Sequence, residues 1–199
     1  MKTKTLLFVL LIATLSYGQK MKVKEGSIKN LKGISQYDLI FDYSDLQIPK
    51  YDSENDFLKD KMAKREKKNK GSGEVFKKSW FEDRDKRYHP MFIESFNKRF
   101  KEGEVVVSIG DQAKYVMKIH TTKLYPGYNV GIVRHNAEID ALVTVYEKAN
   151  PENILLQGTY KNVQGKGAMG YDYDSGFRIS HCYAKLAKNI ASYITKKTK

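Results

Sequence analysis

The stretch NAEIDALVTVYE, residues 136–147, decides the fold because its small and β-branched apolar residues recur at every second position. These residues run from Ala137 to Val145 and alternate with a second set that begins at Glu138. Successive side chains of a strand point to opposite faces, so a period of two produces one apolar face and one more polar face. The stretch is therefore predicted to be a strand with one buried face.

Similar stretches lie on both sides of this strand. Residues 113–125 and 153–163 are predicted to be strands, and residues 104–110 are predicted to form a shorter one. Pro126-Gly127 interrupts the first join and residues 149–151 interrupt the second. Sequential strands with short joins favour an antiparallel meander. A further strand, with alternating apolar residues, is predicted near the beginning of the segment QYDLIFDYSDLQI, residues 36–48.

Helical patterns fill the remaining regions. Ser53 is a predicted N-cap for a helix over residues 54–69, and further helices are predicted around residues 76–80 and after Pro90. Residues 177–194 carry apolar side chains at three- and four-residue steps, as an amphipathic helix does. We therefore expect an α+β fold: a largely antiparallel sheet of four to five strands with helices packed on one face, including this C-terminal amphipathic helix.

The N-terminus is typical of an export signal. Two lysines precede an apolar run from Leu6 to Ala13, and the small residues Ser16 and Gly18 follow. The run is too short to span a bilayer. We expect residues 1–18 to be a signal peptide cleaved after Gly18, so that the mature chain is periplasmic or secreted. Residues 19–199 are then predicted to form a single α+β domain, with residues 19–35 as a loose leader.

The chain is strongly basic, with a formal net charge of +13. Such an excess speeds association with anionic partners, and it also keeps a protein soluble through self-repulsion. For an exported protein the anionic partners are lipid head groups, lipopolysaccharide, acidic glycans and extracellular nucleic acid. The basic segment 59–70 has the same two interpretations, a phosphate-binding helix or a solvated one, and its lack of interleaved aromatic residues favours the second.

The segment GKGAMG, residues 165–170, has the spacing of a dinucleotide-binding loop. In that loop the third glycine lies inside a helix, and a further strand follows. Here the helix is predicted to begin near residues 174–176, and the 29 residues after Gly170 leave no room for another strand. We therefore expect no nucleotide cofactor. Asp172 and Asp174 resemble part of a calcium loop, but its later oxygen ligands are missing, so helix capping by Asp174 or Ser175 is expected instead.

The sequence contains no contiguous catalytic or metal-binding motif. Its four histidines lack the spacing that places two ligands on one helix face, and no G-x-S-x-G segment is present. Cys182 is the only cysteine and lies on the apolar face of the C-terminal helix, so we expect a buried, inert thiol. The sequence therefore favours a protein that is not an enzyme, and we assign no catalytic residue, metal site or cofactor. An exported hydrolase whose site is assembled from distant residues is the alternative.

Three segments carry a resemblance to known proteins. At YPGYNVGIVRHNAEIDA (residues 125–141), YDYDSGFRISHCYAKLAK (residues 171–188) and FDYSDL (residues 41–46), the chain resembles a group of uncharacterised exported proteins of Gram-negative envelopes. Its layout is similar to that of small periplasmic α/β modules. The resemblance implies an envelope location and an α+β fold, and it implies no catalytic residue.

Two loops concentrate residues of the types found at binding hot spots. In a meander the loop after residue 125 and the loop after residue 164 lie at the same end of the sheet. The alternative interpretation is that the tyrosines pack the loops down, with Arg178 paired to Asp172 or Asp174. We expect a non-catalytic binding or adaptor module that contacts an envelope protein or an anionic glycan, and nonspecific binding of polyanions is a further alternative. The predicted binding residues are Tyr125, Tyr128, Asn129, Arg134, Tyr171, Asp172, Tyr173 and Arg178.

Overall fold

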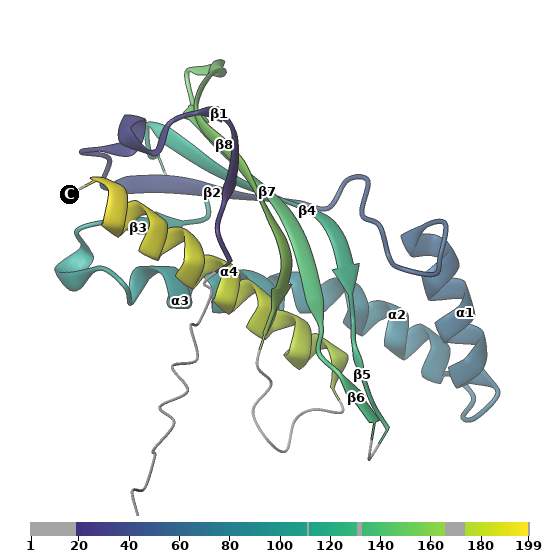
Figure 1. Ribbon diagram of the computed structural model, residues 1–199. Coiled ribbons are helices and arrows are strands. Elements are labelled where there is room, and N and C mark those ends of the chain that lie inside the picture. The colour runs from purple at the N-terminus through teal and green to yellow at the C-terminus, as the bar shows by residue number, and fades with distance from the viewer. Residues whose placement is uncertain (1–18, 111, 131–132, 166–173, 199) are drawn as a thin grey trace, which may run out of the picture.

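The computed structural model describes residues 19–110, 112–130, 133–165 and 174–198. Its centre is a six-stranded sheet crossed on one face by two helices, and a small two-stranded hairpin extends from one end of the sheet (Figure 1). The predicted signal peptide, residues 1–18, lies outside the described residues. The α+β class expected from the sequence is confirmed.

The strand order of the main sheet is β1-β8-β7-β4-β2-β3, and β5 pairs with β6 in the hairpin. The meander predicted for the second half of the chain is confirmed, because β4, β7 and β8 pair antiparallel in sequence order. The strands are β1 (Lys22–Gly26), β2 (Gln36–Asp42), β3 (Val106–Ser108), β4 (Tyr115–Tyr125), β5 (Tyr128–Val130), β6 (Val133–His135), β7 (Glu138–Glu147) and β8 (Asn150–Gln164).

The prediction of a largely antiparallel sheet of four to five strands needs correction. The main sheet has six strands and is mixed, because β2 runs parallel to both β3 and β4. Parallel neighbours require a long crossover connection. The helices between β2 and β3 supply it, which returns the chain to the sheet in the same direction.

The helices divide into a covering pair and a projecting pair. α3 and α4 cross one face of the sheet, whereas α1 and α2 form an arm to one side of it (Figure 1). A π-helical turn joins α2 to α3 without a break. The helical segments are α1 (Glu54–Glu66), α2 (Ser72–Asp83), the π-turn (Arg84–Tyr88), α3 (His89–Asn97), α4 (Ser175–Thr198) and two short 3-10 turns (Ile28–Leu31 and Lys101–Gly103).

The core lies between the sheet and the α3–α4 layer. The alternation that predicted β7 is confirmed, since Ile139 and Val143 are fully buried while Leu142 and Thr144 on the opposite face are only half-buried. The predicted apolar stripe of the C-terminal helix is buried as well. Its members are Ile179, Cys182, Tyr183, Leu186, Ile190 and Ile194.

The residues expected to be a loose leader take part in the fold. Residues 22–26 form the edge strand β1, which pairs antiparallel with β8, and the 3-10 turn after it buries Ile28 and Leu31. At Gly26 the backbone has a φ of 68°, and a side chain there would meet the Leu155 carbonyl. Without β1 the outer edge of β8 would be unpaired, and pairing with β1 satisfies backbone groups along that edge.

The α1–α2 arm is fastened to the π-turn by one half-buried carboxylate. Glu54 accepts hydrogen bonds from Trp80 Nε1 at 2.6 Å and from Arg84 at 2.5 Å. The predicted N-cap of α1 is confirmed, because Ser53 Oγ accepts from the backbone N–H of Asp56. No helix within the described ranges has both the length and the apolarity needed to cross a membrane.

Candidate functional site

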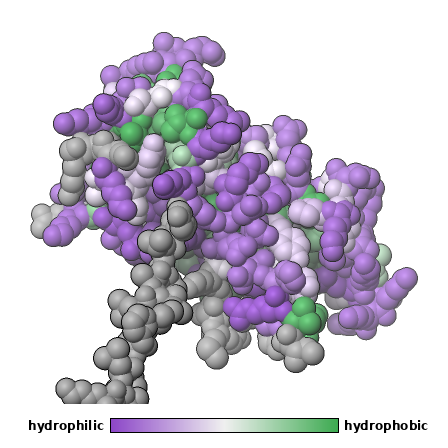
Figure 2. Space-filling model, in the orientation of Figure 1, coloured by the Kyte–Doolittle hydropathy of each residue, from purple (hydrophilic) through white to green (hydrophobic). Residues whose placement is uncertain are grey.

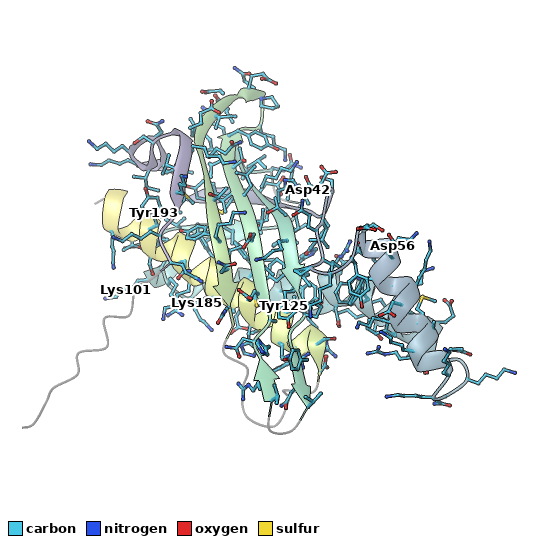
Figure 3. The ribbon with its side chains drawn as sticks, turned by 45° about the vertical axis from the view of Figure 1, so that its right-hand side comes forward. Asp42, Asp56, Lys101, Tyr125, Lys185 and Tyr193 are labelled. Carbon is cyan, nitrogen blue, oxygen red and sulfur yellow. The ribbon has the colours of Figure 1, made fainter. Side chains whose placement is uncertain are left out.

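The sequence-predicted site lies partly on the β5–β6 hairpin. Tyr125 ends β4 and is half-buried, where the sheet passes into the hairpin (Figure 3). Tyr128 pairs across the hairpin with His135, and their rings lie 4.7 Å apart. Asn129 is opposite Arg134 in the same ladder. Burial raises the pKa of the Tyr125 hydroxyl, which Tyr128 and Glu138 raise further. These four residues are therefore neighbours in space.

Of the four binding residues predicted around the second loop, Arg178 is the one that the structure describes, and it lies in α4. It is buried, and its guanidinium donates to the carbonyl oxygens of Pro126 at 3.2 Å and Gly127 at 3.3 Å. The expectation that the two loops lie at the same end of the sheet agrees with these contacts. Arg178 acts as a tie between α4 and the hairpin, a structural role. Tyr171, Asp172 and Tyr173 lie outside the described residues.

Of the GKGAMG segment, only Gly165 is described. The preceding strand β8 is antiparallel to both of its neighbours, and α4 begins at Ser175, after the glycines. This arrangement differs from the parallel strand and glycine-opened helix of a dinucleotide site. Asp174 caps α4, since its Oδ1 accepts from the N–H groups of Gly176 and Phe177. The capping role expected for Asp174 is confirmed.

Cys182 is fully buried, as the helix pattern predicted. Burial raises the pKa of its thiol to about 12, and the Gly165 N–H, which donates to the sulfur, partly offsets that rise. The thiol itself donates to the Ala137 carbonyl oxygen at 3.2 Å. A thiol that stays protonated and has no access to solvent is not a nucleophile.

A second candidate site lies on the face of the sheet that α3 and α4 leave uncovered. A groove of about 780 Å³ runs across strands β1, β8, β7 and β4 and the loop after β2. Basic side chains dominate it, with two aspartates against them. Its lining residues include Lys20, Lys22, Lys24, Lys123, Lys161, His120, Asp45 and Asp140, together with the amide and hydroxyl side chains of Gln19, Gln47, Thr122 and Thr159.

Asp140 organises the middle of this groove. The pairing register shifts on both sides of it, at Thr122 in β4 and at residues 161–162 in β8. Such bulges bend strands and increase their twist. Asp140 is buried and accepts from the backbone N–H of Asn162 at 2.7 Å, which supports the left-handed backbone of Asn162, φ 51°. A single buried carboxylate therefore holds the irregular backbone where the groove forms.

The cations of the groove are only partly neutralised. Lys161 Nζ lies 3.0 Å from Asp140 and Lys123 Nζ lies 3.7 Å from it, so one carboxylate serves two ammonium groups. Lys20, Lys22 and Lys24 are exposed at alternate positions along the β1 edge. The pairing of β1 with β8 shifts between Val23 and Glu25, at Lys24, and all three lysines line the groove. The surface thus presents excess positive charge in a concave setting.

The sequence contained a signal for this row that the prediction missed. Lysines at residues 20, 22 and 24 have a period of two, but the intervening apolar positions are too few to identify a strand. The partners Lys123, Asp140 and Lys161 were each visible only as surface charges on separate strands. Their convergence depends on sheet order and on the two bulges.

A depression of about 670 Å³ lies between the α1–α2 arm and the start of α4. Its charges pair internally: Arg87 contacts both Asp83 and Asp174. Burial raises the pKa of Asp83, while Arg87 acts to lower it. For Asp174, burial acts to raise the pKa, but the hydrogen bond from Arg87 prevails and lowers it. These ion pairs join the helices, so the depression has less excess charge to offer a ligand.

Two of the histidines, His89 and His120, make contacts that suit structural roles. His120 Nε2 lies 2.7 Å from the Ser44 carbonyl oxygen, and His89 Nε2 lies 3.0 Å from the Tyr43 hydroxyl. His89 also stacks on Phe41, with ring centroids 4.0 Å apart. Within the described ranges no three His, Cys, Asp or Glu side chains are grouped so that they could hold a metal ion.

Comparisons of the chain with models of known protein families, with curated proteins and with solved structures found no match. The resemblance to exported envelope proteins therefore stays a prediction.

Proposed function

We propose that the protein is an exported, non-catalytic binding module of the cell envelope, and that the groove on its open sheet face holds an anionic glycan. The observation that carries the proposal is the row of lysines at residues 20, 22 and 24 facing Lys123 and Lys161 across a concave surface. Clefts lined by charge of one sign concentrate ligands of the opposite sign.

The other lining residues favour a glycan among the anionic polymers. Thr122, Thr159 and the carboxamides of Gln19 and Gln47 offer donors and acceptors that match sugar hydroxyls. Proteins that bind single-stranded nucleic acid add aromatic side chains on which bases stack. The groove lining contains no Phe, Tyr or Trp among the described residues. The lysines then meet the carboxylate, sulfate or phosphate groups of the sugar chain.

A binding role fits the groove better than hydrolysis. Its histidine, His120, contacts a backbone carbonyl, and its buried carboxylate, Asp140, is engaged by two lysines and a backbone N–H. General acid–base catalysis needs a group poised to exchange a proton with the substrate. Both side chains instead hold the groove in shape.

Isothermal titration calorimetry with heparin, a soluble anionic glycan, tests the proposal. The Lys22→Gln, Lys24→Gln double variant is expected to bind roughly 25-fold more weakly, because each exposed cation near an anionic surface contributes about 1 kcal/mol. The control is Lys67→Gln, Lys70→Gln, the same charge change at exposed positions around the end of α1. Equal losses in both variants would show that net charge alone binds heparin, and stronger binding of single-stranded DNA than of heparin would reject the glycan.

A further inference from the structure

We propose that the β5–β6 hairpin docks on a lipid bilayer containing anionic head groups, with one face of the hairpin entering the interface. This inference concerns a surface separate from the groove and does not depend on the glycan. The hairpin extends beyond the main sheet (Figure 1), and hydrophobic atoms are exposed at its end, with another group at the opposite, upper left part of the view (Figure 2).

The hairpin is amphipathic across its two faces. Val130 pairs with Val133, and Tyr128 pairs with His135, so these four side chains share one face of the ribbon. The intervening pair of Asn129 and Arg134 belongs to the opposite face. One face is therefore apolar and aromatic, and the other is polar and basic.

The apolar face is uncovered. Val130 is 67% exposed, Val133 is 46% exposed and Tyr128 is 37% exposed, whereas most aliphatic side chains within the described ranges are buried. An apolar face backed by a basic polar face is the pattern of segments that lie in a membrane interface. Tyrosine is also enriched at that depth, because its ring is apolar and its hydroxyl is polar.

The hairpin is held in position relative to the body. Arg178 donates to the carbonyl oxygens of Pro126 and Gly127, which lie at the entry to β5. Gly127 has a φ of 65°, and a Cβ at this position would come within 2.5 Å of the His135 carbonyl oxygen. The two arms of the hairpin thus approach closely at its base. A pre-organised surface loses less conformational freedom when it docks.

Charge and shape favour a lipid surface as the occupant. Residues 125–137 contain one arginine and no acid, and the whole chain has a net charge of +13, which complements anionic head groups. A stable protein interface buries about 800 Å² on each partner. A narrow hairpin with a few exposed apolar side chains offers much less, but in a bilayer each apolar group contributes as it leaves water. A second copy of the chain is therefore a poorer fit.

Vesicle binding tests the inference with variants that keep the charge unchanged. The Val130→Thr, Val133→Thr double variant retains side-chain shape and β-branching, and its hydroxyls disfavour an apolar environment. We expect its affinity for vesicles of phosphatidylcholine mixed with phosphatidylglycerol to fall about tenfold. Val75→Thr is the matched control, because Val75 is 66% exposed on α2, and it is expected to bind like wild type.

A fluorescent reporter locates the contact. Trp80 is the only tryptophan of the sequence and is buried. A Tyr128→Trp variant therefore adds one indole whose fluorescence reports on the surroundings of the hairpin. Its emission is expected to shift to the blue when vesicles are added. Unchanged emission, or equal vesicle binding by wild type and the double threonine variant, overturns the inference. A concentration-dependent dimer in analytical ultracentrifugation that the threonine variant abolishes would instead assign the hairpin to a second copy of the chain.

Discussion

Replacing Asp140 by asparagine is expected to have opposite effects on stability and on glycan binding. The variant removes the negative charge that Lys123 and Lys161 share, while its side-chain oxygen can still accept from the Asn162 N–H. Stability should fall, because that hydrogen bond loses its ionised acceptor. Affinity for heparin should rise, because the groove gains one unit of net positive charge.

The contacts set the size of both effects. A hydrogen bond to a charged group contributes about 1.5–3 kcal/mol and a neutral one about 1 kcal/mol. The pair with Lys161 adds little, since 65% of that lysine side chain is exposed. We expect a loss of about 1–2 kcal/mol in the free energy of unfolding, which lowers Tm by about 3–6 °C for a chain of this size. Heparin affinity should rise about fivefold.

Differential scanning calorimetry and heparin titration at one salt concentration measure the two changes. Asp52→Asn is the control, because it makes the same charge change at an exposed position before α1. A variant that binds heparin more weakly than wild type would refute the role given to Asp140 and to the surrounding lysines. An unchanged Tm would refute its role in holding the bulges.

Three further predictions concern stability and reactivity. Glu54→Ala should lower the free energy of unfolding by about 1.5–3 kcal/mol and shift Trp80 fluorescence emission to the red, because the variant loses the acceptor that fastens the α1–α2 arm. Unchanged emission would contradict that role. Cys182 should react with a thiol reagent only after unfolding in urea, since burial removes it from solvent and raises the pKa of its thiol to about 12; rapid modification of the native protein would contradict this. Burial lowers the pKa of both His89 and His181 below the ordinary 6.5, so the unfolded chain binds more protons once the pH falls below about that value. The two neutral imidazoles therefore contribute to stability above pH 6.5, and this contribution is lost as the pH falls. When urea unfolding is measured from pH 7 to pH 5, the urea concentration at the midpoint should decline less for His181→Gln than for wild type.

The features that followed from the sequence are those set by neighbours along the chain. Alternation identified β4, β7 and β8, and a three- and four-residue repeat identified α4 and the burial of Cys182. The cap at Ser53 was also readable, because capping joins residues three positions apart. Each of these rests on local geometry, and the tertiary structure left each unchanged.

The location of the candidate binding residues was only partly readable. Tyr128 and Arg134 were correctly placed near the end of the sheet where α4 begins. Arg178 carried no sign that it would be buried against two carbonyl oxygens, because its partners are more than 50 residues away in the sequence. Hot-spot residue types therefore did not separate an exposed surface from a structural tie.

Sequence alone determined the longer strands and the helices and which face of each one is apolar, but it did not identify β1, β5 or β6. Only the tertiary structure decided that β2 lies parallel to β4, that residues 22–26 complete the sheet edge, and that lysines from β1, β4 and β8 and from the residues before β1 gather around Asp140. The physical reason is that periodicity specifies the face a side chain occupies, whereas backbone hydrogen bonding between distant strands specifies neighbour, direction and register. The groove arises at two bulges, where that pairing departs from the regular ladder that a period of two describes.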